Sequence, residues 1–199
     1  MTTIPDPLDD EYWSQRYNTR QTGWDIGKAS TPLISYMQQV PPQQQRILIP
    51  GCGNAWEAEI LLSMGFTNIT LIDLSSALVR QLHQRLSGTP IHVLHGNYFD
   101  HVASYDLILE QTFLCALTPA LRGLYASHTQ QLLLPGGKLV GVLFNRSFAG
   151  GPPFGGSSAE YQKLLSPFFR IKTLSPCYNS IAPRAGSEVF FIAEKKSLA

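Results

Sequence analysis

Residues 46–57 read Arg-Ile-Leu-Ile-Pro-Gly-Cys-Gly-Asn-Ala-Trp-Glu, and residues 70–73 read Thr-Leu-Ile-Asp. A short apolar run stops at a Gly-x-Gly turn, a helical pattern begins at Ala55, and a second apolar run ends on Asp73. In such a unit the glycines let the backbone approach a ligand, and the helix N-terminus presents unpaired N–H groups. An acidic residue about 20 positions later is placed to accept ribose hydroxyls. The stretch therefore predicts an adenosine-containing ligand.

The residues at the end of the glycine turn distinguish between two adenosine-containing ligands, a dinucleotide and S-adenosylmethionine. A dinucleotide fingerprint is Gly-x-Gly-x-x-Gly, whose third glycine allows the helix to pack closely on the strand. Here Trp56 takes that place, and its bulk is expected to crowd a pyrophosphate. The observed Gly51-x-Gly53-x-Ala55 suits a shorter ligand without phosphates, such as the amino-acid end of S-adenosylmethionine. A nicotinamide-dependent oxidoreductase is the alternative.

The composition limits the possible partners. At 199 residues the chain fits one domain, which we assign to residues 1–199. Fifteen basic residues nearly balance fourteen acidic ones, and no basic stripe is visible, so we expect no nucleic-acid partner. No apolar run approaches the roughly 20 residues that a membrane span needs. We expect a small-molecule substrate and a monomer.

The cysteines and the N-terminus indicate the compartment. Three cysteines, Cys52, Cys115 and Cys177, are an odd number without Cys-x-x-Cys spacing. This pattern argues against a zinc site or a disulfide framework and for a reducing environment. Residues 1–10 are polar and acidic, which is unlike a signal peptide. We therefore expect a cytoplasmic protein without a bound metal.

Strands and helices alternate from residue 46 onward. We predict strands at 47–49, 69–72, 91–94, 106–109, 139–144, 169–174 and 189–193, and helices at 11–17, 55–64, 75–86, from 118 towards 134, and at 158–165. Thr31-Pro32 resembles an N-cap followed by proline at the first helical position. The alternation predicts an α/β fold, a doubly wound, Rossmann-like, mostly parallel sheet. The last two strands lack an intervening helix and are expected to form an antiparallel pair at one edge.

Ligands of such sheets lie at the carboxyl ends of the strands. The residues that follow the predicted strands are therefore the candidates for a site. They are residues 51–54, Asp73, residues 96–99, residues 110–113 and Asn145.

Several further segments resemble one family of proteins. These are Trp13-x-x-x-Tyr17, Gly23-Trp-Asp-Ile-Gly27, Pro50-Gly-Cys-Gly53, Phe113-Leu-Cys-Ala116, Gly150-Gly-Pro-Pro-Phe154 and Ser180-Ile-Ala-Pro-Arg-Ala-Gly-Ser-Glu188. Together they resemble the S-adenosylmethionine-dependent methyltransferases of the thiopurine methyltransferase superfamily, and within it the halide and thiol methyltransferases. The resemblance covers almost the whole chain. It implies a seven-stranded class I methyltransferase core at residues 46–199, preceded by an N-terminal helical lid at residues 1–45.

The resemblance also assigns cofactor contacts. It places the methionine portion on Gly51 and Gly53, the ribose on Asp73 with Leu74 beside it, and the adenine on Asn97, Tyr98 and Phe99, with Glu110 as a further contact. Trp13, Tyr17 and Trp24 are implied to form a lid over the sulfonium. Aromatic faces attract cations, which suits that role, although anchoring of an N-terminal helix is the alternative.

Two positions depart from the family pattern. Asn97 stands where many relatives carry Asp, yet its amide oxygen can still accept from the adenine amino group. Phe154 stands where some relatives have Tyr, which removes any role of a hydroxyl there. The second change bears on which substrate the protein takes.

The chemistry implied is methyl transfer to a soft nucleophile such as a thiol, a halide, thiocyanate or a thiopurine. The donor is already activated, so the protein has chiefly to align the nucleophile and exclude water. Arg184 is a candidate for attracting an anionic nucleophile, or else a surface charge beside Glu188. Asp25 either caps a helix and holds the lid or receives a thiol proton. A non-catalytic S-adenosylmethionine-binding protein is a further alternative.

Overall fold

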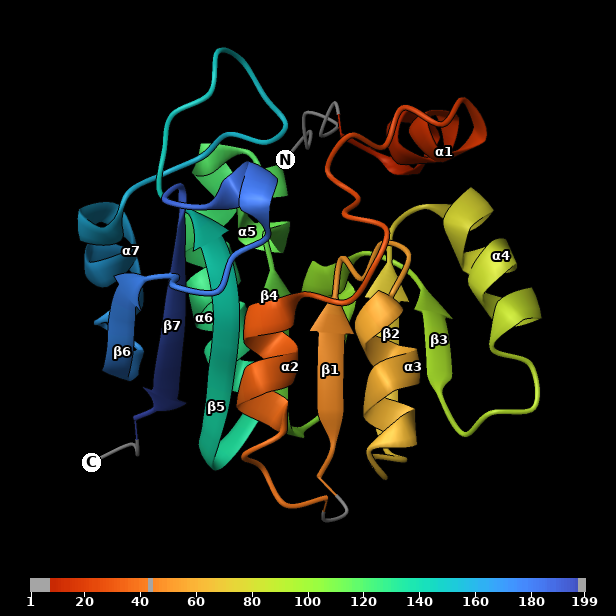
Figure 1. Cartoon of the computed structure of the whole chain (residues 1–199), viewed down its shortest axis with the longest axis horizontal. Helices are drawn as coiled ribbons and strands as arrows, with labels where there is room; N and C mark the ends of the chain where they lie inside the picture. The colour runs from red at the N-terminus through yellow and green to blue at the C-terminus, as the bar shows by residue number, and fades with distance from the viewer. Residues whose placement is uncertain (1–7, 43–44, 197–199) are drawn as a thin grey trace.

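The computed structural model describes residues 8–42 and 45–196 (Figure 1). Its centre is one sheet built from Ile47–Pro50 (β1), Ile69–Asp73 (β2), His92–His95 (β3), Tyr105–Gln111 (β4), Leu133–Phe144 (β5), Phe169–Pro176 (β6) and Glu188–Lys195 (β7). The strand order is β3-β2-β1-β4-β5-β7-β6. The first five strands are parallel, and β7 runs antiparallel to both β5 and β6. The predicted mostly parallel seven-stranded sheet with an antiparallel edge pair is confirmed.

The helices form a layer on each face of the sheet. They are Asp10–Asn18 (α1), Thr31–Met37 (α2), Trp56–Ser63 (α3), Ser76–Arg85 (α4), Phe113–Ala116 (α5), Arg122–Leu132 (α6) and Ser158–Leu165 (α7). In Figure 1, α2 and α3 lie in front of the sheet and α6 lies behind it. The helix α1 lies above the carboxyl ends of the strands, where Oδ1 of Asp10 accepts the N–H of Ser76 at the start of α4 over 2.8 Å.

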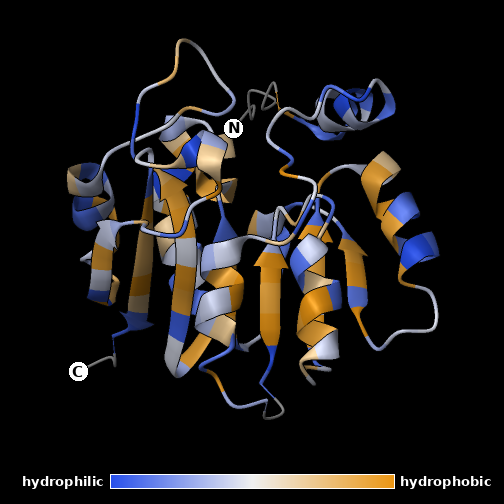
Figure 2. Ribbon diagram, in the orientation of Figure 1, coloured by the Kyte–Doolittle hydropathy of each residue, from blue (hydrophilic) through white to orange (hydrophobic). Residues whose placement is uncertain are grey.

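Alternation along the strands explains the two layers. Successive strand residues point to opposite faces. Ile47 and Ile49 of β1 join a core with α2, α3 and α4, whereas Leu48 joins the core formed with α6 and α7. Both faces of β1 are therefore buried, and Figure 2 shows this strand as a continuous apolar run. Burial on both faces is the pattern expected of a central parallel strand.

The boundary predicted between the helix that runs from residue 118 towards 134 and the strand at 139–144 was wrong. Residues 118–134 do not form one helix, because Pro119–Leu121 is a separate 3-10 turn (η2) and α6 ends at Leu132. Residues 135–137, Pro-Gly-Gly, lie between the predicted helix and the strand predicted at 139–144, and they are part of β5. The register explains how. Tyr105 pairs with Leu133 and Leu107 pairs with Lys138, so the extra residues of β5 bulge out and pairing resumes beyond them.

Two smaller differences lie near the site. Ser30, not Thr31, precedes α2 as its N-cap, so Thr31 is the first helical residue. The short helix α5 was not predicted, and Thr112 before it has a left-handed backbone with a φ of 59°. Residues 1–7 and 43–44 of the predicted lid segment lie outside the described residues.

Gly141 of β5 provides a test of how tightly this sheet is packed. A Cβ at this position would lie 2.5 Å from Cβ of Glu110 and 2.7 Å from Cε1 of Phe191. We expect Gly141→Ala to lower the free energy of unfolding by about 1–3 kcal/mol through overpacking. Gly123 in α6 is the matched control, because an added Cβ there meets no atom within 4 Å. Gly123→Ala should raise stability by about 0.5–1 kcal/mol. Urea titration measures both, and a Gly141→Ala protein as stable as wild type would contradict this packing.

Candidate active site

A cavity of about 550 Å³ lies at the carboxyl ends of the parallel strands, beneath the N-terminal segment. This volume is in the range of about 300–1,000 Å³ that small-molecule sites occupy. Most of the predicted site residues line it: Trp13, Tyr17, Trp24, Asp25, Gly51, Gly53, Asp73, Leu74, Asn97, Tyr98 and Phe99. The strand order explains why the residues that follow β1, β2 and β3 come together. These three strands are adjacent and parallel, so their carboxyl ends lie side by side.

The glycine turn after β1 is held open by its backbone. Gly51 and Gly53 both have a φ of 52°, a left-handed conformation that favours glycine. A Cβ on Gly51 would lie 2.1 Å from Cδ2 of Phe113, so the turn is packed directly against α5. The N–H of Gly53 donates to Oδ2 of Asp73 over 3.1 Å.

Asp73 ends β2 and joins two backbone segments. Its Oδ1 accepts the N–H of Ser75 over 3.0 Å, while Oδ2 holds Gly53. Burial raises the pKa of Asp73, and these backbone N–H groups act in the opposite direction on the same pKa. Asp73 lines the cavity beside Leu74, and its carboxylate oxygens can accept further hydrogen bonds.

The segment after β3 forms the floor expected under an adenine. Oδ1 of Asn97 accepts the N–H of Phe99 over 3.0 Å, which caps the short 3-10 helix Tyr98–Asp100 (η1). The hydroxyl of Tyr98 is turned into the core, where it lies 2.7 Å from Oγ1 of Thr129. The ring of Tyr98, not its hydroxyl, is therefore the part available to a ligand.

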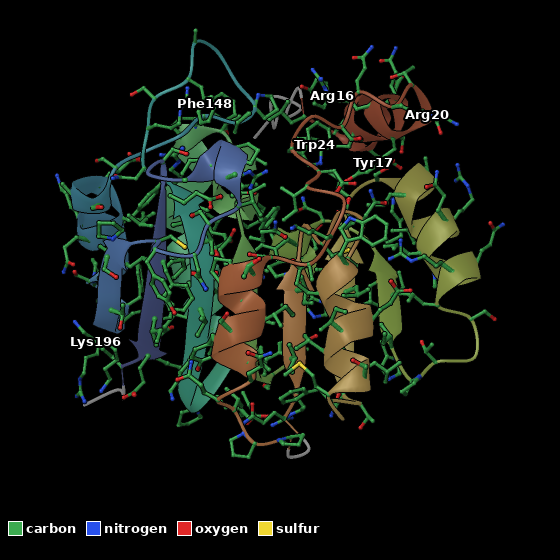
Figure 3. The ribbon with its side chains drawn as sticks, viewed as in Figure 1. Arg16, Tyr17, Arg20, Trp24, Phe148 and Lys196 are labelled. Carbon is green, nitrogen blue, oxygen red and sulfur yellow. The ribbon has the colours of Figure 1, made fainter. Side chains whose placement is uncertain are left out.

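Three aromatic side chains cover the cavity from the N-terminal side. The ring of Trp24 lies between those of Trp13 and Tyr17, with centroid distances of 5.4 and 5.9 Å and nearly perpendicular planes. Figure 3 shows Tyr17 and Trp24 near α1, with Phe148 on the loop across from them. Burial raises the pKa of Tyr17, which keeps its hydroxyl neutral beside Asp73. The three rings are thus uncharged, and aromatic faces are groups that attract cations.

Asp25 clamps the segment that carries Trp24. Oδ1 accepts the N–H of Gly27 over 2.7 Å and Nε1–H of Trp56 over 2.8 Å, and Oδ2 accepts from the side chain of Asn54. These bonds tie the segment to the residues after the glycine turn. The geometry matches the holding role considered for Asp25 and leaves its carboxylate little capacity to take a thiol proton.

Arg184 lies outside the cavity wall and is paired with Glu188, the neighbour named in the second of the two possibilities considered for it. Its Nη2 donates to the carbonyl of Trp24 over 2.6 Å, and Nη1 donates to Oε1 of Glu188 over 3.2 Å. Its guanidinium also stacks 4.9 Å from the ring centre of Phe144, which does line the cavity. The charge is thus paired and partly buried, and Arg184 connects the lid segment to the opposite wall.

Glu110 is also outside the cavity, although it was expected to contact the cofactor. Its side chain is fully buried, and Oε1 accepts the N–H groups of Phe113 and Leu114 while Oε2 accepts the hydroxyl of Tyr125. Burial raises the pKa of Glu110 to about 7. Glu110 therefore holds α5 in place, and its neighbour Gln111, which points the other way, lines the cavity.

Of the far half of the cavity, reasoning from strand ends reached only Phe113. The wall of this half is apolar and comes from α5 and the residue after it, η2, α6, the end of β5 and the loop after it: Phe113, Leu117, Leu121, Leu124, Phe144, Pro152 and Pro153. The Phe113-Leu-Cys-Ala116 and Gly150-Gly-Pro-Pro-Phe154 segments were noticed as motifs. The two motifs indicated that these segments are part of the site, but the sequence did not show which of their side chains line the cavity.

Comparison with known proteins decides the family. The sequence profile of the family described as thiopurine S-methyltransferase matches residues 8–196. The chain belongs to the thiopurine S-methyltransferase family. It is 31% identical to the probable thiol methyltransferase 2 of Arabidopsis thaliana over 187 residues, which cover 88% of this chain and 81% of that protein. It is 23% identical to thiocyanate methyltransferase 1 of Brassica oleracea over 197 residues, or 93% and 85% of the two chains.

The fold matches solved methyltransferases as well. The 1,6-didemethyltoxoflavin-N1-methyltransferase of Burkholderia thailandensis, solved with S-adenosylhomocysteine, superposes with a TM-score of 0.74 at 19% identity over 94% of this chain and 87% of that one. The protein is thus an S-adenosylmethionine-dependent methyltransferase with the class I fold. Membership of this family decides against the nicotinamide-dependent oxidoreductase. None of the helices in residues 8–42 and 45–196 has the length and apolar character that a membrane crossing requires.

The buried carboxyl of Glu110 predicts a pH effect on stability. Its pKa of about 7 lies above the ordinary value of 4.5, so its contribution is complete below about pH 4.5 and is lost as the pH rises through about 7. Between about pH 5 and about pH 8 we expect the wild-type unfolding free energy to fall by roughly 2–3 kcal/mol more than that of Glu110→Gln. Glutamine keeps an acceptor for α5 and cannot ionise. Chemical denaturation at both pH values measures the difference, and equal pH dependence in the two proteins would show that Glu110 titrates normally.

Proposed function

We propose that this methyltransferase transfers the methyl group of S-adenosylmethionine to the sulfur of a small thiol. The observation that carries the proposal is the division of one cavity. The ends of β1, β2 and β3 offer the polar groups that an adenosyl amino acid needs, whereas the ends of β4 and β5 offer an apolar space beside them. The thiol methyltransferase of Arabidopsis thaliana is a relative at 31% identity, which supports a sulfur acceptor.

The geometry of the glycine turn and of Asp73 fits S-adenosylmethionine as the methyl donor. Gly51 and Gly53 of the left-handed turn line the cavity without a side chain, and the carboxylate of Asp73 is bonded to this turn. When bound, S-adenosylmethionine supplies an activated methyl group on a sulfonium. The chain then has to orient the acceptor against that group and to exclude water, and it needs no strong base to do so.

We assign the exclusion of water to the aromatic rings above the cavity. Trp24 is the central ring of the three and contacts both of its neighbours. Asp25 ties its segment to the glycine turn, and Arg184 ties it to the wall of Phe144. In this proposal Asp25 and Arg184 are positioning residues that hold the lid. A cytoplasmic location and a monomeric state stay predictions.

Product analysis tests the proposal directly. Wild-type protein with S-adenosylmethionine carrying a 13C-methyl group and benzenethiol should give labelled methyl phenyl sulfide and S-adenosylhomocysteine in equal amounts. Nuclear magnetic resonance detects the first and chromatography the second. Tight binding of S-adenosylhomocysteine without methylation of any thiol would instead support a non-catalytic binding protein.

Asp73→Ala tests the donor site. Losing a charged acceptor shared by two ribose hydroxyls should cost about 1.5–3 kcal/mol, which is roughly ten- to a hundred-fold in S-adenosylmethionine affinity. Asp106→Ala is the control, since Asp106 pairs with Arg46 at the other end of the sheet. Calorimetry measures both, and unchanged affinity in Asp73→Ala would remove this residue from the site.

Trp24→Ala tests the lid. Cation–π attraction in a desolvated site is worth about 2 kcal/mol, so kcat/KM should fall roughly thirty-fold. If Trp24 merely anchors the N-terminal segment, the melting temperature falls while activity per folded molecule stays near that of wild type. Both quantities are measured on one preparation.

A double-mutant cycle tests whether Arg184 acts through Trp24. Lysine cannot reach Glu188 and the Trp24 carbonyl together, so Arg184→Lys alone should lower kcat/KM about tenfold. In the Trp24→Ala background the same change should add less than about twofold, because the ring that Arg184 positions is gone. Arg170→Lys, at an exposed ion pair on β6, is the control. Fully additive losses would mean that Arg184 does not work through the lid.

A further inference from the structure

The charged groups of the cavity wall all have one sign. Four carboxyl groups line it, from Asp9, Asp25, Glu57 and Asp73, whereas no Lys, Arg or His of residues 8–42 and 45–196 does so. Residues 1–7, which precede Asp9, contain no basic side chain in the sequence either. Such a wall favours the donor, which carries a sulfonium and an ammonium against a single carboxylate. It disfavours any further anion.

Several basic side chains lie close to residues of this wall without lining the cavity themselves. Arg85 donates to the carbonyl of Asn54, lies 4.9 Å from the ring centre of Trp56 and pairs with Glu59 over 3.5 Å. Nε2 of His95 lies 3.1 Å from the carbonyl oxygen of Leu74 and 3.2 Å from Oδ2 of Asp10. Neither Arg85 nor His95 lines the cavity.

Arg184 is bound to Glu188 and to the carbonyl of Trp24. The guanidinium of Arg16 lies over the ring of Tyr12 at 4.6 Å, and that of Arg146 lies over the ring of Phe148 at 4.7 Å. None of the three lines the cavity.

The acceptor half of the cavity adds a second observation. Its wall is made of aromatic, leucine and proline side chains, and the nearest polar side chains on it are the uncharged Gln111 and Thr112. A small hydrated anion that enters such a space gives up its water and finds no charged partner from the chain. An apolar ring or alkyl group gains from the same surface.

We propose that the acceptor of this enzyme is a neutral thiol on an apolar body, and that free inorganic anions and carboxylated thiols are poor acceptors. This inference rests on the proposed function and narrows it. It sets the chain apart from its relative named thiocyanate methyltransferase 1, with which it shares 23% of its residues. It also reassigns Arg184, which the sequence analysis considered as an anion attractor.

The reaction balances without an additional reagent. The thiol enters with its proton, and the proton leaves to the solvent before the lid closes, because the sulfonium charge favours the thiolate. A bond forms between this sulfur and the methyl carbon as the methyl–sulfonium bond breaks. The electron pair of the broken bond stays on the sulfur of S-adenosylhomocysteine.

A matched pair of acceptors tests the inference. Benzenethiol and 4-sulfanylbenzoate share the ring and the thiol, but the second carries a carboxylate. We expect kcat/KM for benzenethiol to exceed that for 4-sulfanylbenzoate, thiocyanate and iodide at least about tenfold, since bringing like charges together costs several kcal/mol. Calorimetry with the S-adenosylhomocysteine complex should show binding of benzenethiol at concentrations where thiocyanate gives no heat.

A charge-reversal variant shows whether the wall itself sets this preference. Leu124 lines the cavity and is half exposed at its edge, so a lysine there is accommodated. Leu124→Lys should raise the ratio of kcat/KM for 4-sulfanylbenzoate to that for benzenethiol about fivefold or more. Val102→Lys is the control, because Val102 is 92% exposed and lies outside the cavity wall. That variant should leave the ratio at its wild-type value.

The possible outcomes distinguish failure of the neutral-acceptor inference from failure of the proposed methyl transfer. Thiocyanate, iodide or 4-sulfanylbenzoate used as well as benzenethiol would overturn the neutral-acceptor inference while leaving methyl transfer in place. An unchanged ratio in Leu124→Lys would also overturn it. Failure of every acceptor, anionic or neutral, with S-adenosylhomocysteine still bound would overturn the proposed function itself.

Discussion

The contact between the carboxylate of Asp73 and the N–H groups of Gly53 and Ser75 is the constraint on which the site depends. It joins the end of β2 to the turn after β1 and to the start of α4. The turn can take its left-handed form because its residues are glycines, and that form keeps the backbone open towards the cavity. The residue that organises the turn thus also lines the cavity. In the function proposed above, the same carboxylate binds the ribose of the donor.

The remaining walls are held by contacts between distant segments. Asp25 connects the Trp24 segment to the residues after the glycine turn, and Arg184 connects the same segment to the C-terminal hairpin. On the other side, the guanidinium of Arg122 donates to the carbonyl of Gly155 over 2.7 Å and pairs with Glu160, which fixes the loop that carries Pro152 and Pro153. The charges of Arg184 and Arg122 are therefore paired outside the cavity wall, and the acceptor half of the cavity surface is left apolar.

Much of the fold was predictable because apolar runs and turn residues repeat in a regular order along the chain. The prediction failed where strand pairing overrode the local preference of proline and glycine for a turn. Residues 135–137 bulge within β5, and the hydrogen-bonded pairing of β5 with β4 resumes after them. For the site, strand ends located the glycine turn and Asp73 correctly on the cavity wall. The direction in which a side chain points was harder to predict. Glu110 and Gln111 are adjacent, yet Glu110 is buried beneath α5 and Gln111 lines the cavity. The acceptor wall depends on α5, α6 and a loop that are brought together by tertiary packing, which a single sequence does not display.

The most direct test of the account is a crystal structure of the protein with S-adenosylhomocysteine and an apolar thiol or its thioether. The account predicts the ribose hydroxyls on the Asp73 carboxylate, the homocysteine along Gly51 and Gly53, and Trp24 over the thioether sulfur. The second ligand should lie against Phe113 and Phe144 with its sulfur facing that of the cofactor product. A ribose away from Asp73, or an acceptor bound through Arg184, would contradict it.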